Sequence, residues 1–527
     1  MKKRLSALLL IAVMVLSMAA CGKKTGTSGS FEKSDDPVTI TYYYINGGGG
    51  TQQYTEQVEE KLNELLKTYE GYEHITIDLV PHDEANYQRD FTLAQSTSKQ
   101  IDLVSTYGLD FNTMVKNGDF IELDELMEQF PDTVSEIPEW VVNYGNVHGA
   151  QYYIPTFQQA ANLTYIAMPD EYLEMYMDAY GKTREEVSKL IIDGDVEDKL
   201  DFMEDLCLAV REATNSDTKW INPGELWATN LTSNVFYNQE YIGEQFGHWI
   251  LREGADAPEY FGYTKDYKVI MERMAEWFQE GLLHPECTTV NYHKFIGENY
   301  LNDESYVFEF VTDTCTEEYL AEYMELMNEG IPMEAFRVTD HAYIPSEWEA
   351  GGHAIYADCE HPVEAMMIIE LLRTEKGKEF YNTLVYGLEG THWEWEDKEN
   401  ERILTLEFKE TQGDATTSYC CYKWNTGNVF NAWKNQAVLP GFYEYVVDKV
   451  HEGDDTVKSP AMGITWDYSD VKNQVSQCQV VEKEYARTIF ISEDWEARYD
   501  EYIEKLEDAG VQDVLDELKK QYNEYIK

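Results

Sequence analysis

The 527-residue sequence lacks the short motifs of the common catalytic sites. It contains no GxSxG, HExxH or P-loop motif and no complete EF-hand loop. Basic residues are also few, with 41 Lys and Arg against 99 Asp and Glu, which gives a formal net charge of −58. A field of this sign repels nucleic acid and anionic lipid, so neither is expected as a partner.

Cysteine is sparse and has no metal-binding or redox spacing. The eight cysteines form no CxxC pair, which excludes zinc-ribbon and thioredoxin-like sites and favours buried free thiols. Acidic residues between Asp193 and Glu204 fall at EF-hand-like spacing. Asp198, however, occupies the position where glycine makes the sharp turn of that loop. We therefore expect no metal site and no cofactor.

The N-terminus has the pattern of a lipoprotein export signal. Lys2, Lys3 and Arg4 precede an apolar stretch, and small residues then lead to Cys21. The pattern predicts a signal peptide over residues 1–20, with Cys21 resembling the lipidated cysteine of a lipobox. The alternative is an ordinary secreted protein in which this cysteine is incidental. Residues 21–36 are rich in Lys, Gly, Ser and Thr, which is typical of a flexible linker.

Beyond the linker, strand and helix patterns alternate. Val38–Ile45, Ile75–Val80 and Ile101–Val104 read as strands, separated by stretches of helical periodicity. This order predicts a parallel α/β sheet, in which ligands bind at the carboxyl ends of the strands. Asn46, Tyr107 and Asp110 follow the first and third strands and are therefore candidate ligand-binding residues.

Aromatic residues are abundant, with 12 Trp and 39 Tyr, and many tryptophans stand in polar contexts. An aromatic face can stack on a sugar ring while a neighbouring amide or carboxylate binds its hydroxyl groups. The alternative is that these tryptophans, Trp424 and Trp466 in particular, belong to the core. The further candidates for a sugar site are Tyr153, Trp227, Trp424 with Asn428, and Trp466 with Asp467.

A series of segments, in order, resembles the extracellular solute-binding proteins of ABC importers, of the family 1, sugar-binding type. Segments in the second half of the sequence narrow the resemblance to a Firmicutes lipoprotein subgroup that carries the DUF3502 region. The segments that carry the resemblance are Ile101–Met127, Asn146–Pro155, Glu276–Glu286, His361–Trp393, Tyr422–Phe430 and Lys505–Ile526.

The resemblance implies an α/β fold: a two-lobed, periplasmic-binding-protein-like clamp of type II, with mixed sheets flanked by helices. The expected first lobe covers 37–150 and receives roughly 306–356. The expected second lobe is mainly helical, covers 151–305 and continues over roughly 357–440. Residues 441–527 are expected to form a C-terminal region with closing helices.

The function implied by the resemblance is capture of a carbohydrate by lobe closure and its delivery to an ABC permease. The strongly acidic charge favours a neutral oligosaccharide. We expect a monomeric binding protein, not an enzyme, lipid-anchored on the extracellular face of a Gram-positive cell membrane. Two alternatives remain open: a peptide-binding ABC receptor and a surface glycoside hydrolase.

Overall fold

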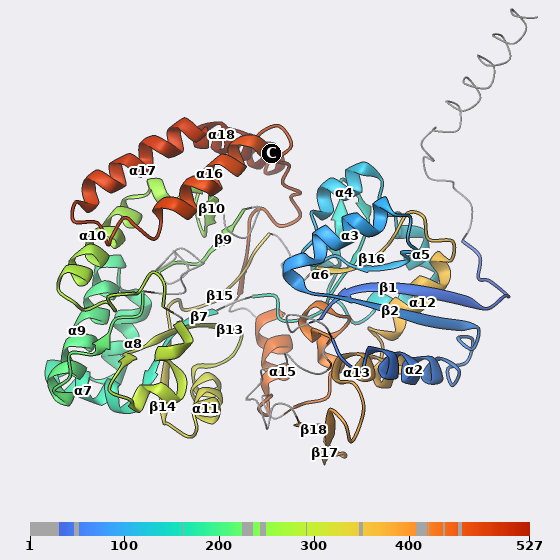
Figure 1. The fold of residues 1–527 in the computed structure, drawn as a ribbon, viewed down its shortest axis with the longest axis horizontal. Helices are drawn as coiled ribbons and strands as arrows, with labels where there is room; N and C mark the ends of the chain where they lie inside the picture. Colours follow the sequence, from blue (N-terminus) through green and yellow to red (C-terminus); the bar gives the residue numbers. More distant parts are fainter. Residues whose placement is uncertain are drawn as a thin grey trace, which may run out of the picture.

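The computed structural model describes residues 31–46, 52–161, 163–223, 236–242, 249–290, 292–346, 351–406, 419, 421–435, 438–451 and 456–527. Cys21 and Trp227, both named above, lie outside these described residues. The described chain forms two lobes, each built of sheet and helix (Figure 1). No helix in the described ranges is long and apolar enough to cross a membrane.

The first lobe is built on a mixed five-stranded sheet. Its strand order is β2-β1-β3-β16-β6. Strands β2 and β3 run parallel to β1, whereas β16 runs antiparallel to both β3 and β6. The three strands predicted at the start of the chain are confirmed, with small shifts at their ends. The strand bounds are β1 Val38–Ile45, β2 Ile75–His82, β3 Leu103–Ser105, β6 Ile154–Pro155 and β16 Gly352–Ile355.

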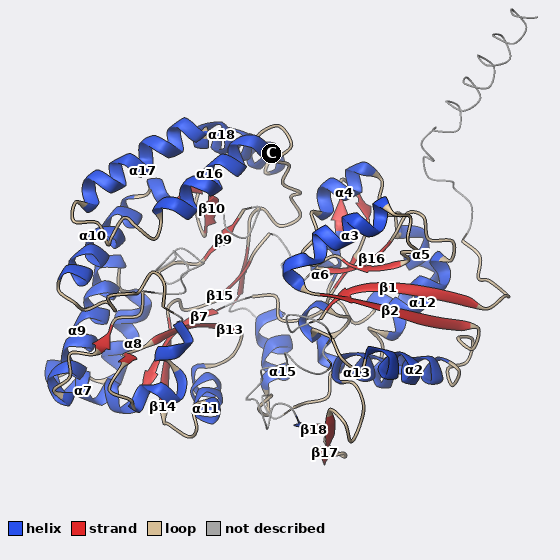
Figure 2. Ribbon diagram, viewed as in Figure 1, coloured by secondary structure: helices blue, strands red, loops and turns tan. Residues whose placement is uncertain are grey.

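Helices flank this sheet (Figure 2). Helix α2 buries one apolar stripe, which includes Val58 and Leu62, as its helical periodicity predicts. Helix α12 is apolar nearly all round and is almost wholly buried, with Pro362 in its first turn. The helices of this lobe are α2 Thr55–Leu66, α3 Tyr87–Ser96, α4 Phe111–Asn117, α5 Asp124–Gln129, α6 Glu139–Val142, α12 Pro362–Leu371 and α13 Lys378–Tyr386.

The second lobe has a larger helical share and several small sheets. Its central sheet has the antiparallel order β13-β7-β14. Helices α8 and α9 both begin at capping boxes, formed by Thr183 with Glu186 and by Asp195 with Asp198. The main elements are β7 Leu163–Pro169, α7 Asp170–Tyr180, α8 Arg184–Asp193, α9 Val196–Thr214, β9 Gln239–Tyr241, β10 Trp249–Arg252, α10 Lys265–Gln279, β13 Glu309–Asp313, α11 Glu317–Met327, β14 Met333–Arg337 and β15 Ala342–Ile344.

The C-terminal helices pack on the second lobe. These are α16 Lys472–Tyr485, α17 Trp495–Ala509 and α18 Val511–Tyr525. Tyr502 of α17 and Tyr260 both donate hydrogen bonds to the buried carboxylate of Glu482 on α16. Gly510 separates α17 from α18 and has a φ of 86°, the left-handed conformation in which glycine ends a helix.

The division of the chain between the lobes differs from the prediction. Residues from 306 onward were expected in the first lobe, but strand β13 pairs with β7 of the second lobe. Residues 306–344 therefore belong to the second lobe. Conversely, α12 and α13 bury their apolar residues in the core of the first lobe. Sequence order did not reveal this exchange, because strand pairing over more than a hundred residues determines it.

Candidate functional site

Within the described residues, three chain segments connect the lobes, and hydrogen bonds place them side by side. The first follows β6, the second leads from β15 to β16, and the third follows Gly427 (Figure 1). Phe157 of the first segment receives a hydrogen bond from the Val429 amide at 2.9 Å and donates one to the Gly427 carbonyl at 2.9 Å. Thr156 likewise donates to the Gly351 carbonyl at 3.0 Å. The connections therefore form one hydrogen-bonded hinge.

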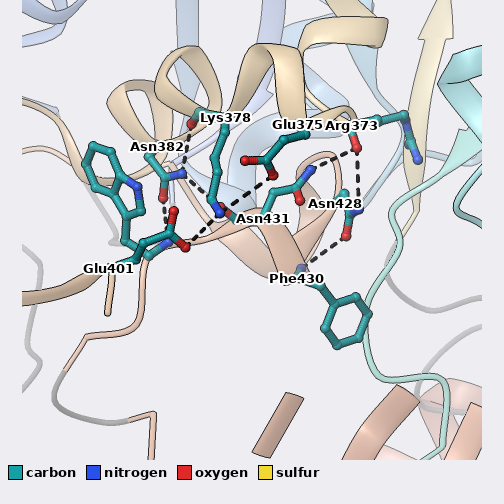
Figure 3. A network of polar contacts seen from close by, with 9 residues as sticks. Arg373, Glu375, Lys378, Asn382, Glu401, Asn428, Phe430 and Asn431 are labelled. Atoms are coloured by element: carbon teal, nitrogen blue, oxygen red, sulfur yellow. Dashed lines mark hydrogen bonds and ion pairs between the residues drawn. The ribbon is translucent and has the colours of Figure 1, made fainter. Parts of the chain in front are cut away.

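The third connection is fixed to the first lobe by a network of asparagine side chains (Figure 3). Asn431 Nδ2 donates to the Arg373 carbonyl at 2.9 Å, and Asn428 Nδ2 approaches the same oxygen at 3.4 Å. Asn382 Nδ2 in turn donates to the Asn431 carbonyl at 2.9 Å. Asn428, a predicted ligand residue, is buried and uses its amide to hold the hinge.

Gly427 is required at its position in this connection. Its φ is 61°, and a Cβ atom there would lie 2.1 Å from the Leu372 carbonyl oxygen. Any larger residue would therefore push the third connection away from the helices of the first lobe.

A buried histidine lies at the centre of the hinge. The ring of His451 packs against Trp140 of the first lobe and against Phe157 and Phe430 of two connections, with centroid separations of 5.4–5.8 Å. Its Nε2 accepts a hydrogen bond from the Ala160 amide at 3.1 Å, which requires that this nitrogen carry no proton. Burial lowers the pKa of His451 to about 4, so the imidazole is neutral at physiological pH.

The residues predicted at the strand ends occupy one edge of the first-lobe sheet. Asn46 is buried and its backbone amide donates to the His82 carbonyl at 3.0 Å. Tyr153, a candidate beside Pro155 and not at a strand end, is buried against Phe111. Tyr107 is half-buried and its hydroxyl donates to a Glu84 carboxylate oxygen at 3.0 Å.

Asp110 and Asp467 take part in ion pairs that join the lobes. Lys116 Nζ of α4 lies 2.6 Å from Asp467 Oδ2, and Lys472 Nζ lies 3.6 Å from Asp110 Oδ2. Burial opposes ionisation of Asp467, but the bonds from Lys116 and Ser469 outweigh it and lower its pKa to about 2. All four charged side chains are more than a third exposed, so each pair contributes little to stability.

The two candidate tryptophans that lie within the described residues, Trp424 and Trp466, differ sharply in environment. Trp466 is 2% exposed and belongs to the core of the second lobe. Trp424 is half-buried, and the Lys423 ammonium lies 4.5 Å from the centre of its ring. Of the two, Trp424 alone keeps part of its surface open to solvent.

Sequence reasoning missed the polar groups near Trp424. Burial raises the pKa of Asp313, which ends strand β13, although a hydrogen bond with Gln159 and the charge of Lys423 oppose the shift. Burial lowers the pKa of Lys423 to about 8, although Asp313 opposes this shift. Lys423 stands next to Trp424 in the sequence, but no pattern pointed to Gln159 or Asp313. The region offers an aromatic face together with amide, carboxylate and ammonium groups, which suits stacking and hydrogen bonding.

Comparisons with known proteins agree with this architecture. Residues 460–527 match the family described as a domain of unknown function, DUF3502. A carbohydrate ABC transporter substrate-binding protein from Streptococcus pneumoniae serotype 4 is 29% identical over 166 residues. That match spans 31% of this chain and about a third, 32%, of the length of the relative.

Solved structures match over nearly the whole chain. The N-glycan transport solute binding protein NgtS from S. pneumoniae is 17% identical with a TM-score of 0.71, over 93% of this chain and 99% of that one. A human-milk-oligosaccharide (HMO) binding, ABC-transporter-associated solute binding protein from Bifidobacterium longum infantis is 12% identical with a TM-score of 0.63, over 94% of this chain and 100% of that one. The chain therefore has the two-lobed fold of the solute-binding proteins of ABC transporters, and its last residues, 460–527, match the DUF3502 family.

Proposed function

We propose that this protein is the substrate-binding protein of an ABC importer and captures an oligosaccharide between its lobes. The observation that carries the proposal is the hinge, in which three adjacent connections join two separately cored lobes. The similarity to NgtS, which has been solved in complex with Man1GlcNAc and with Man5GlcNAc, supports a carbohydrate as ligand.

The hinge suggests how binding is converted into a signal. A ligand that contacts both lobes only when they are close favours the closed arrangement through its differential affinity. The asparagine network fixes the third connection to the first lobe, so movement is confined to the short segments between the cores. The exposed ion pairs of Lys116 and Lys472 form only when α4 lies near residues 467–472. Because these ion pairs are weak, ligand binding determines the equilibrium between the open and closed arrangements.

The proposed ligand-binding residues come from both lobes and the hinge. The first lobe provides Asn46, Tyr107, Asp110 and Tyr153, the second provides Asp467, and the hinge provides Trp424. Their position and partial exposure support adding Gln159, Asp313 and Lys423 to this set. Asn428 and Trp466 act in this proposal by holding the hinge and the second-lobe core.

The proposed anchoring, location and oligomeric state rest on the amino-acid sequence. We propose that Cys21 is lipidated and tethers the protein to the extracellular face of the membrane, where it acts as a monomer and delivers ligand to permease subunits. The protein performs no catalysis in this scheme. A peptide is the second candidate ligand, because a net charge of −58 would attract a cationic one.

A ligand screen tests the proposed function. An oligosaccharide at 100 times its Kd is expected to raise the free energy of unfolding by about 2.7 kcal/mol, because it binds only the folded state. Thermal unfolding with a panel of neutral glycans and cationic peptides measures this. Binding of a neutral glycan should persist at 1 M salt, where the Debye length is about 3 Å, whereas binding of a cationic peptide should weaken. Turnover of a glycan at enzymatic rates would instead favour a hydrolase.

Replacing Trp424 with alanine should weaken oligosaccharide binding at least tenfold, about 1.4 kcal/mol, because the stacking surface is lost. Isothermal titration calorimetry with the ligand from the screen measures this. Trp395 on the β17 strand, Trp393–Asp397, is a matched control, since it is also half-buried and has a lysine near its ring. Trp395→Ala should leave affinity unchanged. Equal affinities of the two variants would remove Trp424 from the site.

A further inference from the structure

The guanidinium of Arg373 is buried with little compensation. The residue is 2% exposed and follows α12 at the base of the hinge. Its Nη2 donates to the Ile154 carbonyl at 2.6 Å. Its Nε and Nη1 have no hydrogen-bond partner within the described residues, and no carboxylate there forms an ion pair with it. A buried cation with unsatisfied donors is unfavourable unless an opposite charge lies beside it.

The neighbouring polar groups are also buried and include further donors. His353 and Tyr381 are each 0% exposed and lie close enough to Arg373 to interact with it electrostatically. The Tyr381 hydroxyl and His353 Nδ1 have no partner in the described part of the chain. His353 Nε2 is bonded to the Tyr42 hydroxyl at 2.9 Å. When Nε2 accepts from Tyr42, Nδ1 carries the hydrogen and becomes a donor.

His353 and Tyr381 are both uncharged, so neither balances the positive charge of Arg373. Burial, with the positive charge of Arg373, holds the pKa of His353 well below its usual range, so its ring is neutral. Burial also raises the pKa of Tyr381 well above its usual range, so its hydroxyl stays protonated and can donate. The cluster therefore carries one positive charge and several donors that have no acceptor among the described residues.

The cluster touches the hinge connections. Ile154, which accepts the Arg373 bond, directly precedes Pro155 and the first connection, and it pairs with His353 in the sheet. The Arg373 carbonyl accepts the bonds from Asn428 and Asn431 of the third connection. Figure 3 shows the Arg373 side chain pointing away from these two asparagines.

We propose that Arg373, together with Tyr381 and His353, binds a small monovalent inorganic anion such as chloride inside the first lobe, at the base of the hinge. An anion supplies both the negative charge and the acceptor that Nε and Nη1 lack. A monovalent anion matches the single charge, and the complete burial of the cluster excludes a bulky carboxylate ligand. The site is separate from the proposed oligosaccharide site, because none of these side chains reaches solvent.

Thermal unfolding in different anions tests the proposal. The protein is compared in chloride, bromide and gluconate at equal ionic strength, with gluconate as the anion too large to enter. The melting temperature should be higher in chloride and bromide by about 3 °C when the small anion is roughly tenfold above its Kd. Crystals grown in bromide should show an anomalous scattering peak beside Arg373 Nε and Nη1.

Three substitutions test whether the anion-dependent change in melting temperature arises at Arg373. Arg373→Gln should abolish the difference between chloride and gluconate. Tyr381→Phe removes one donor with little change in packing and should reduce the difference, which keeps the test decisive if Arg373→Gln fails to fold. Tyr263→Phe is the control, since it removes another hydroxyl that has no partner among the described residues but belongs to the second lobe. Equal melting temperatures in the three salts, with no bromide peak at Arg373, would overturn the proposal.

Discussion

Replacing Trp466 with alanine is expected to lower the free energy of unfolding by about 3–5 kcal/mol, the usual cost of removing a buried tryptophan from a well-packed core. The side chain is 2% exposed and is among the largest fully buried ones in the second lobe. Its neighbour Asp467 is fixed by a hydrogen bond from its amide to Gln521 of α18 at 2.9 Å, so the backbone cannot easily collapse into the space. Chemical denaturation followed by circular dichroism measures the change.

Two further variants serve as comparisons for Trp466→Ala. Trp466→Phe keeps most of the buried aromatic volume and should lose clearly less stability than the alanine variant. Trp424→Ala, at a half-buried position, should cost far less than Trp466→Ala. A Trp466→Ala protein that unfolds like the wild type but no longer binds oligosaccharide would place Trp466 in the ligand site, as the sequence had allowed.

The hinge histidine should make the protein less stable as the pH falls from about 6.5 toward 4. The pKa of His451 is about 4 in the folded protein and about 6.5 when unfolded. Below pH 6.5 the unfolded chain therefore binds a proton that the folded protein refuses, which favours unfolding. The expected loss from this residue is about 2 kcal/mol at pH 5 relative to pH 7.5. Denaturant unfolding measured at several pH values between 5 and 7.5 yields the dependence.

His451→Gln isolates this contribution. Glutamine is neutral throughout the range, so the variant should lose about 2 kcal/mol less than the wild type between pH 7.5 and 5. Burial also lowers the pKa of His353 and His392, but both remain in the variant and their contributions cancel in the comparison. Parallel pH profiles for the two proteins would show that His451 accepts its proton freely in the folded state.

The order of the amino acids is enough to predict the local elements and the fold class. β1 could be predicted because it is a run of β-branched and aromatic residues, nearly all of which are buried. Helix α2 could be predicted because its buried apolar residues recur at helical spacing. The order of the segments that resemble solute-binding proteins predicted the two-lobed architecture, which the similar solved structures confirm.

The assignment of segments to lobes depends on contacts between residues that are distant in the sequence. Residues 306–344 and helix α12 contribute to the lobes opposite to those expected, because pairing between distant strands outweighs proximity along the chain. The same holds for the candidate site. Trp424 and Trp466 both stand beside polar residues, so the sequence does not distinguish them. Packing nevertheless buries Trp466 and leaves Trp424 half-buried. Desolvation lowers the pKa of both Arg373 and His451, and it depends on neighbours that are far away in the sequence.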